Sequence, residues 1–257
     1  MKTINESEIK YLAGLLDADG SLNITHNNGY LGLVLNLELA ESCDRDGFYI
    51  QSLAARVGNI YTRKREENWA QTNTWRVNKR SDLEQLLPRI IKHMVIKGLH
   101  WNNLLNLFRE KQGDILSSNE YAVLQDFSDK SRKIAGGLHP KKHPTWAWAT
   151  GYIEGDGWFL IRDRVKQVEM HVGVVSHADD RVGIDLLQKA FGGVVKFDNK
   201  GYVRWIKNLG PRDKSFVDRT LPKFIYHSRL KRHKMEQIVA IHSQRLNEFT
   251  AKADVIV

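Results

Sequence analysis

The 257-residue chain is 42% hydrophobic and 27% charged, a composition typical of folded globular proteins and not of disordered or fibrous ones. Its 39 Lys and Arg exceed its 30 Asp and Glu, and the net charge of +9 fits a phosphate-bearing partner or, equally, an ordinary basic enzyme. The single cysteine, Cys43, excludes an internal disulfide framework and a thiolate zinc site.

Targeting and membrane signals are not evident in the sequence. No apolar run approaches the roughly 20 residues that span a bilayer. The first residues lack the apolar core of a signal peptide and the Arg and Ser content of a transit peptide. We therefore expect an intracellular, soluble protein with no membrane partner. A mitochondrion, a chloroplast, a bacterial or archaeal cell and a phage host all fit these features.

The chain begins with a helix start signal followed by an unusual nonapeptide. Asn5 followed by Glu8 resembles a capping box, which predicts a helix that runs to about Asp17. The nonapeptide LAGLLDADG overlaps the end of this helix and finishes at Gly20, where a turn is expected. Its Asp-Gly ending places a carboxylate, Asp19, at the helix end.

Period-two alternation follows the helix. Five leucines at alternate positions from Leu31 to Leu39 predict a strand with one buried face, and alternate apolar residues from Leu22 predict its partner, joined through an Asn-Asn-Gly turn. A short helix closed by Gly58 comes next, then two strand-like runs near 60–65 and 73–78.

The second half of the chain repeats the first. The nonapeptide ATGYIEGDG, which ends at Gly157, heads the second half as LAGLLDADG heads the first. Further on, LAARVGNI matches LQKAFGGV, and LPRIIKHMVIKGLHWNNL matches LPKFIYHSRLKRHKMEQI, which aligns Lys97 with Lys231. Val168, Met170, Val172 and Val174 repeat the strand alternation. Three matched segments in the same order indicate a fused duplication.

Each half therefore reads helix, two strands, helix, two strands, helix. We predict an α+β fold of two pseudo-symmetric αββαββα halves, each with an antiparallel four-stranded sheet covered by helices on one face. The predicted halves are residues 1–110 and 145–257, joined by a linker at 111–144 that could hold a helix over Asn119 to Lys133. A monomer with internal pseudo-two-fold symmetry is expected, because the duplication supplies both halves.

The two nonapeptides predict one shared site. Each has small residues spaced i,i+4 on one helix face, Gly14 and Ala18 in the first copy and Gly151 and Gly155 in the second. The two helices are therefore expected to pack closely on each other. Asp19 and Asp156 would then emerge side by side, which is costly unless a cation offsets their charge. A hard divalent ion is the expected solution, although each Asp could instead cap a turn.

At these nonapeptides the chain resembles the LAGLIDADG homing endonucleases, specifically the single-chain members with two motifs. The first copy departs from the name-giving sequence only at Leu16. The second has Glu154 in place of Asp and keeps Gly151, Ile153, Asp156 and Gly157. The resemblance implies a saddle of two sheets over the DNA major groove and metal-dependent phosphodiester hydrolysis that breaks both strands, in intron or intergenic homing.

The resemblance also implies a cofactor, a partner and residue roles. The partner would be double-stranded DNA with a long, partly palindromic site, and the cofactor Mg²⁺, with Mn²⁺ as a substitute. Asp19 and Asp156 would be catalytic metal ligands, with the backbone carbonyls of Ala18 and Gly155 as further ligands. Lys97 and Lys231 match the family's basic residue near the scissile phosphate, a position that an ordinary surface lysine could also occupy.

Two further positions depart from the family or remain ambiguous. The family's water-orienting Gln has no match, because Ser42 and Ser176 stand there, with Glu41 and His177 alongside. His93 and His227 align through the repeat, but no second ligand lies at a zincin spacing, which favours packed or solvent-facing helix residues. The seven tryptophans, Trp158 among them, are expected in the core and between the halves.

The residues that contact DNA bases are expected on the sheet faces that no helix covers. If the leucines from Leu31 to Leu39 pack on helices, the residues between them point outward and can reach base edges. The expected DNA-binding residues are Asn23, Thr25, Asn36, Glu38, Arg63, Arg65 and Arg76 in the first half and Arg162, Arg164, Glu169, His171 and Arg204 in the second. Each could alternatively contact only phosphates or water.

Two other functions use the same scaffold. An intron maturase would bind intron RNA, and a regulator would bind DNA without cutting it. The presence of both aspartates and both lysines argues against a pure maturase, though not against a dual role. Nothing in the chain resembles the added DNA-binding module that such regulators usually carry.

Overall fold

The fold is described from a computed structural model, and the structure describes residues 4–40, 44, 47–63, 71–137, 143–164, 167–210 and 213–254. The chain divides into two compact units, Met1–Gly155 and Asp156–Val257. Within the described ranges no helix combines the length and the apolar character that a membrane span requires.

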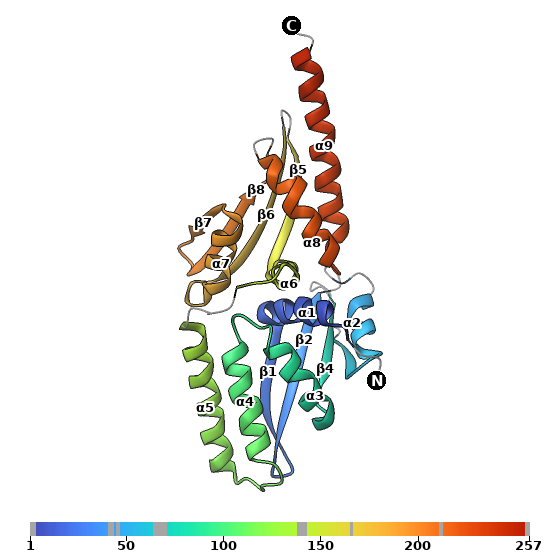
Figure 1. Cartoon of the computed structure of the whole chain (residues 1–257). Coiled ribbons are helices and arrows are strands. Elements are labelled where there is room, and N and C mark those ends of the chain that lie inside the picture. Colours follow the sequence, from blue (N-terminus) through green and yellow to red (C-terminus); the bar gives the residue numbers. More distant parts are fainter. Residues whose placement is uncertain are drawn as a thin grey trace. The chain divides into compact units, whose positions relative to one another are not determined.

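The first unit follows the element order expected from the sequence (Figure 1). It contains α1 (Glu6–Asp19), β1 (Gly20–Asn27), β2 (Tyr30–Ala40), α2 (Phe48–Ala54), β3 (Asn59–Arg63), β4 (Thr72–Val77), α3 (Arg80–Ile91), α4 (Gly98–Glu110), α5 (Ser118–Gly137) and α6 (Trp146–Asp156) up to its penultimate residue. The Asn5 side chain accepts a hydrogen bond from the N–H of Glu8 at 2.9 Å, which confirms the predicted start of α1.

The second unit repeats this order after the end of α6. It contains β5 (Gly157–Arg164), β6 (Gln167–His177), the short turn η2 (Ala178–Asp180), α7 (Val182–Phe191), β7 (Val194–Phe197), β8 (Tyr202–Asn208), the turn η4 (Phe216–Thr220), α8 (Leu221–His227) and α9 (Arg232–Asp254). The two four-stranded antiparallel sheets have equivalent orders, β1-β2-β4-β3 and β5-β6-β8-β7. This confirms the predicted α+β fold with two pseudo-symmetric halves.

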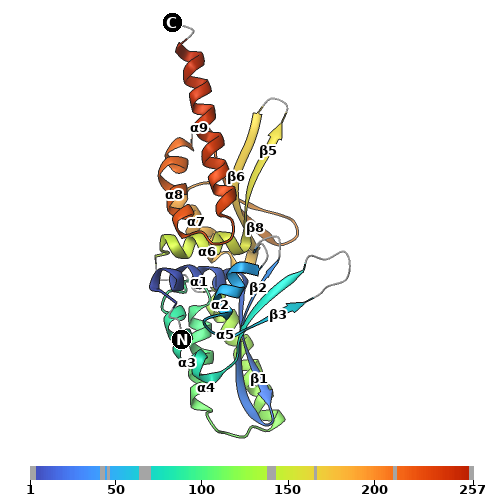
Figure 2. The same ribbon diagram turned by 90° about the vertical axis from the view of Figure 1, so that its right-hand side faces the viewer.

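Alternation along β2 sets which face of the first sheet is buried. The leucines from Leu31 to Leu39 are all 7% exposed or less, as predicted, while the residues between them are half-buried. Helices α3 and α4 lie on one side of this sheet (Figure 2). Asn28 and Gly29 have φ of 51° and 82°, which is the left-handed backbone of the predicted hairpin turn. In the second sheet Met170, Val172 and Val174 are buried as predicted, whereas Val168 is half-buried.

The last helix of each half differs from the prediction, because it is split in two. Helix α3 ends at Ile91, and a non-helical turn reaches Lys97 before α4 begins. In the second unit α8 ends at His227, four residues before Lys231, and α9 begins at Arg232. Both lysines predicted to be catalytic therefore stand immediately before a helix.

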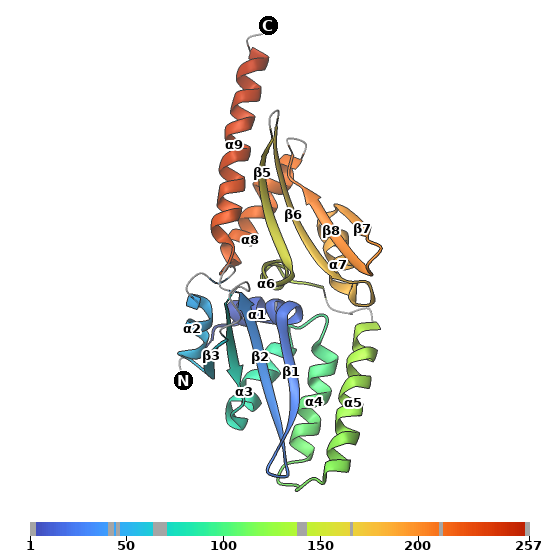
Figure 3. The ribbon, with the colours of Figure 1, turned by 180° about the vertical axis from the view of Figure 1, so that it is seen from behind.

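Helix α5 occupies the segment predicted as a linker and packs on the first unit. It runs alongside α4 (Figure 3), where the Asn103 amide donates to the Ser131 hydroxyl at 3.1 Å. At its other end Tyr121 stacks on His26 of β1, with ring centroids 4.9 Å apart. The segment is thus a structural part of this unit.

The two motif helices make a backbone-to-backbone contact within the first unit. A Cβ added at Gly14 would lie 1.9 Å from the carbonyl oxygen of Trp148 in α6, and one added at Gly151 would lie 2.1 Å from that of Tyr11 in α1. A Cβ added at Gly155 would lie 2.5 Å from the Cβ of Ala18. The predicted packing through small residues is confirmed, because only glycine permits these approaches.

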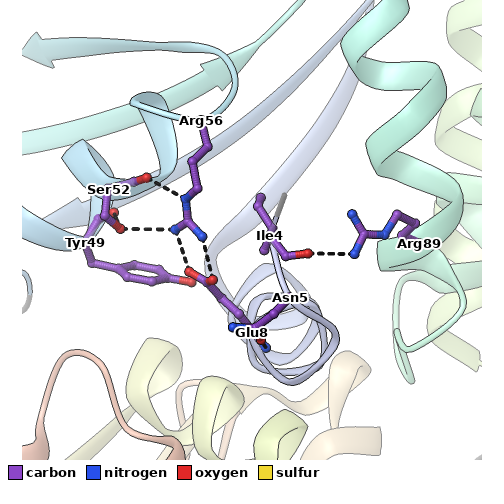
Figure 4. Close-up of polar contacts among 7 residues, drawn as sticks. All are labelled: Ile4, Asn5, Glu8, Tyr49, Ser52, Arg56 and Arg89. Atoms are coloured by element: carbon purple, nitrogen blue, oxygen red, sulfur yellow. Dashed lines mark hydrogen bonds and ion pairs between the residues drawn. The ribbon is translucent and has the colours of Figure 1, made fainter. Parts of the chain in front are cut away.

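The start of α1 is fixed to the neighbouring helices (Figure 4). The Arg56 guanidinium, which follows α2, donates two hydrogen bonds of 2.6 Å to the Glu8 carboxylate. Arg89 of α3 donates to the carbonyl of Ile4 at 2.7 Å. Both partners of the Glu8–Arg56 pair are mostly buried, at 11% and 16% side-chain exposure, so the pair is geometrically restrained. It positions the helix that carries Asp19.

Candidate functional site

Asp19 is the last residue of α1 and lies at the edge of the open face of the first sheet. The chain passes from Asp19 directly into β1 at Gly20, whose N–H donates to the carbonyl of Leu16. Asp19 lines a hollow of about 390 Å³ together with seven residues from the open face: Ser21, Asn36, Glu38, Tyr61, Thr62, Thr74 and Arg76. The catalytic candidate of the first half therefore shares one concave site with three expected DNA-binding residues.

Lys97 is held against the end of α1. Its ammonium donates to the carbonyl oxygens of Ala18 at 2.8 Å, Gly20 at 2.9 Å and Leu16 at 3.2 Å. These carbonyls carry the partial negative charge of a helix C-terminus, which a cation stabilises. Lys97 thus lies at the end of the helix that carries Asp19. The Ala18 carbonyl, which was expected to bind metal, accepts a hydrogen bond from the Lys97 ammonium.

Asp17 is a site residue that the sequence analysis did not identify. Its carboxylate is 3% exposed and accepts hydrogen bonds from the N–H groups of Val95 at 2.7 Å, Ile96 at 3.2 Å and Lys97 at 2.7 Å. The indole of Trp148 donates to it at 2.8 Å. Burial raises the pKa of the Asp17 carboxyl, and the backbone and indole donors oppose that rise. An acidic residue inside an apolar helix was the available signal.

A second hydrogen bond of this kind joins the two motif helices, with the donor on α1 and the acceptor on α6. Glu154 holds the position in the second nonapeptide that Asp17 holds in the first, and Tyr11 matches Trp148 through the repeat. The Tyr11 hydroxyl donates to the Glu154 carboxylate at 2.6 Å, and Glu154 is fully buried. Each motif helix therefore contributes one aromatic donor and one buried acceptor to the contact between α1 and α6.

The second unit places its candidates in matching positions. Asp156 is the last residue of α6, and β5 begins at Gly157. The Lys231 ammonium donates to the carbonyl of Gly157 at 2.5 Å, as Lys97 does to that of Gly20. The expected pairing of Asp19 with Asp156 joins the two compact units and stays a prediction.

The oxygen donors near Asp19 suit a hard divalent cation. The Asp19 carboxylate lines the hollow, and the Ala18 carbonyl lies one residue from Asp19. Among the described residues no three His, Cys, Asp or Glu side chains converge as a metal cage. One or two carboxylates with a backbone carbonyl can hold a hard divalent cation that keeps waters and binds substrate phosphates.

The expected DNA-binding residues of the first half lie on the open face. Asn23 is exposed on β1, and Thr25 is half-buried beside it. The Arg76 guanidinium donates through Nε to Asn36 at 2.8 Å, and Thr72 donates to Glu38 at 2.8 Å. The side chain of Arg63, and Arg65 altogether, lie outside the described residues.

In the second half the expected residues also lie on strands with the predicted facing. Arg162 is exposed on β5 and is paired in register with Glu169 of β6. Burial lowers the pKa of His171, which stays half-buried on β6. Arg204 is exposed on β8 and donates to Asp198 at 3.2 Å, so part of its charge is offset. The Arg164 side chain lies outside the described residues.

Trp158 lies outside the core of the second unit, and two polar candidates have structural roles. Trp158 is half-buried on the open face, with its ring over Gly173, and does not belong to the core. His93 contacts Glu6 at 2.6 Å, in keeping with a helix-packing role. Ser176 donates to the carbonyl of Asp180 at 2.9 Å. The other candidates at the water-orienting positions, Glu41 and Ser42, lie outside the described residues.

Comparison with known proteins establishes the fold family of this arrangement. A scan of protein-family models and a search of curated proteins found no match. Solved structures do match over nearly the whole chain. I-SmaMI bound to an uncleaved DNA target with calcium ions is 16% identical, with a TM-score of 0.66 over 96% of this chain and 93% of that one. The LAGLIDADG meganuclease I-AabMI bound to uncleaved DNA is 15% identical, with a TM-score of 0.64 over 95% and 92%.

A third solved structure gives the same result. The LAGLIDADG homing endonuclease I-GzeII in complex with its DNA target is 15% identical, with a TM-score of 0.67 over 96% of this chain and 92% of that one. At these identities the likeness shows that the chain has the LAGLIDADG endonuclease fold. The sequence motifs at Leu12–Gly20 and Ala149–Gly157 lie on the two helices α1 and α6 of that fold.

Proposed function

We propose that this chain is a single-chain LAGLIDADG homing endonuclease that makes a double-strand break in a long, partly palindromic DNA site. The observation that carries the proposal is the site at the end of α1. There a carboxylate, Asp19, lies at the edge of an open sheet face beside the ammonium of Lys97. Phosphodiester hydrolysis needs a metal-binding carboxylate and a positive charge near the phosphate, on a surface that DNA can reach.

The site residues have different proposed roles in this reaction. Asp19 and Asp156 would hold Mg²⁺, with the Ala18 and Gly155 carbonyls as auxiliary ligands. When bound, the ion would stabilise the negative charge that develops at the phosphate and help to activate the attacking water. Lys97 and Lys231 would add positive charge at the scissile phosphates. The network around Asp17 would keep Lys97 at the end of α1 before DNA arrives.

The net charge of +9 supports a polyanionic partner. Two open sheet faces with different side chains support a site whose two halves are only partly alike. Free-standing and intron-encoded genes both fit this function, and intron homing is the natural biological role for an enzyme of this specificity. The alternative, an RNA-binding maturase, would use the same basic surface for intron RNA.

The test is selection of cleaved sites. The full chain would be incubated with a library of double-stranded DNA that has random segments, with Mg²⁺ or with EDTA, and the new ends sequenced. The proposal expects double-strand breaks in one long, partly palindromic consensus, only with the divalent ion. Absence of cleavage with Mg²⁺ and Mn²⁺, together with tight binding only to structured RNA, would favour the maturase instead.

A further inference from the structure

We propose that the hollow beside Asp19 is a subsite for a guanine base, which Arg76 reads through the O6 and N7 atoms in the major groove. The inference rests on the proposed function, since it requires DNA over the open face of the first sheet. It goes further by assigning one residue and one base identity to one place in the target.

Arg76 is held ready for such a contact. Its Nε donates to the Asn36 side chain at 2.8 Å, and the two residues face each other across β2 and β4. Its guanidinium carbon lies 4.6 Å from the centre of the Tyr61 ring. These two contacts restrain the position of the guanidinium on the open face. Within the described part of the chain, no group bonds to its two terminal nitrogens.

The chemistry of the hollow favours a base edge over a phosphate. Glu38 lines the same hollow and accepts from the Thr72 hydroxyl at 2.8 Å. A carboxylate at this position repels a phosphate but accepts hydrogen bonds from exocyclic amines such as cytosine N4. A guanidinium fork next to a carboxylate therefore matches the acceptors of guanine and the donor of its paired cytosine.

The second half lacks this chemistry at the equivalent register. Ser21 pairs with Asn36, and Asn36 pairs with Arg76, in the first sheet. In the second sheet the corresponding pairs are Trp158 with Gly173, and Gly173 with Ile206. The ring of Trp158 covers Gly173, because a Cβ added there would lie 2.4 Å from its Cζ2 atom. Val175 takes the place of Glu38.

An apolar surface of this kind contacts a thymine methyl group and forms no hydrogen bond to guanine. The guanine preference is therefore expected in the half-site bound by the first sheet and not at the matching base pair of the other half-site. Because Asp19 bounds the hollow, that guanine should lie close to the cleavage position.

The experiment is binding-site selection in EDTA, so that binding is measured without cleavage. The full-length chain, Arg76→Ala and Arg76→Lys would each be selected on the same random library. Affinities would then be measured on the consensus and on its three single-base variants at the guanine. Arg80→Ala is a matched control, because Arg80 also stacks on an aromatic ring, Phe108 at 4.3 Å, but belongs to α3 on the helical side.

We expect the wild type to select guanine at one position and Arg76→Ala to lose roughly 5- to 150-fold in affinity for that base alone. Only the weaker preference that Glu38 gives through the paired cytosine should then remain at that pair, with other positions and the salt dependence unchanged. Arg76→Lys should weaken the preference, since it keeps the charge but not the fork. Arg80→Ala should leave the consensus intact.

Two results would overturn the inference while leaving the endonuclease proposal standing. One is a uniform loss of affinity for all sequences in Arg76→Ala, with the salt slope reduced by about one, which is the behaviour of a phosphate contact. The other is an unchanged base preference in Arg76→Ala. Failure of the wild type to bind any double-stranded DNA would instead overturn the proposed function and this inference together.

Discussion

The carboxylate of Asp17 accepts a hydrogen bond from the backbone N–H of Lys97 at 2.7 Å, while the Lys97 ammonium turns back to the carbonyls at the end of the helix that carries Asp17. The two residues thus close a loop between α1 and the turn that precedes α4. The turn has no helical hydrogen bonds of its own at these N–H groups, so a buried carboxylate satisfies them. Lys97 is positioned by Asp17, and Asp17 in turn by Trp148.

Asp17→Asn should lower cleavage by acting through Lys97. The amide cannot accept from all of its present donors, so the turn should shift, and a displacement of about 1 Å can cost about 100-fold in rate. DNA affinity should change little, because Asp17 is buried away from the sheet face. Single-turnover cleavage and binding of the selected target would be measured in parallel.

A double-mutant cycle separates positioning from a general structural role. Lys97→Met alone should lower cleavage more than binding, because one phosphate contact among many adds little to affinity. Asp17→Asn combined with Lys97→Met should be no slower than Lys97→Met alone, since Asp17 would have nothing left to position. Additive losses would contradict the positioning role. Trp148→Phe, which removes the indole donor and leaves a small cavity in its buried site, should reproduce part of the effect if Asp17→Asn is too unstable to study.

Gly151→Leu should destabilise the contact between the motif helices. Any Cβ at residue 151 meets the Tyr11 carbonyl at 2.1 Å, and neither backbone can yield without separating the helices. We expect a loss of about 3 kcal/mol or more, which for a chain of this size lowers the Tm by roughly 10 °C. Gly210→Ala is the control, because no described atom lies within 4 Å of its Cβ position. Equal melting temperatures for the two variants would show that the glycine contact is dispensable.

Stability should fall with acidification through His100 of α4. Burial lowers the pKa of His100 to about 4, with Arg132 and Lys97 lowering it further and Asp129 opposing them. In the unfolded chain the His100 imidazole is protonated below about pH 6.5, whereas in the folded chain it is protonated only below about pH 4. The free energy of unfolding therefore decreases as the pH falls from 6.5 to 4. The full effect is about 3 kcal/mol.

Urea denaturation of the wild type and of His100→Gln at pH 7 and pH 4.5 would check this expectation. The wild type should lose more stability than the variant between the two pH values, because the amide does not titrate. His171, whose pKa is also lowered by burial, contributes in the same direction to both proteins and cancels in the difference. Parallel pH profiles would exclude His100 as the source.

The sequence was sufficient for the architecture because its signals are local and repeated. Alternation from Leu31 to Leu39 specified the buried face of β2, and small residues at Gly14 and Gly151 specified the helix contact. Long-range polar contacts have no such periodic signature. The bonds from Val95, Ile96 and Lys97 to Asp17 join residues far apart in the sequence. An acidic residue in an apolar helix indicates a buried polar contact but does not identify its partners.

The position of Trp158 outside the core follows from the strand pattern of β5. The alternation of β5, with Phe159 buried, already places Trp158 on the open face, but the general preference of tryptophan for buried positions outweighed that parity. Gly173 on the neighbouring strand leaves the space into which the ring folds. Strand parity is thus a better guide than residue type at positions next to a glycine on the paired strand.

The most direct test of the account is double-strand cleavage of the selected target by Asp19→Asn and Asp156→Asn, compared with the wild type in Mg²⁺. Each variant keeps the size of the side chain and should fold and bind DNA normally. Each should lose double-strand cleavage by several orders of magnitude, because the metal ion that would offset the developing charge on the phosphate loses a carboxylate ligand. Double-strand cleavage by both variants at rates near that of the wild type would contradict the central claim.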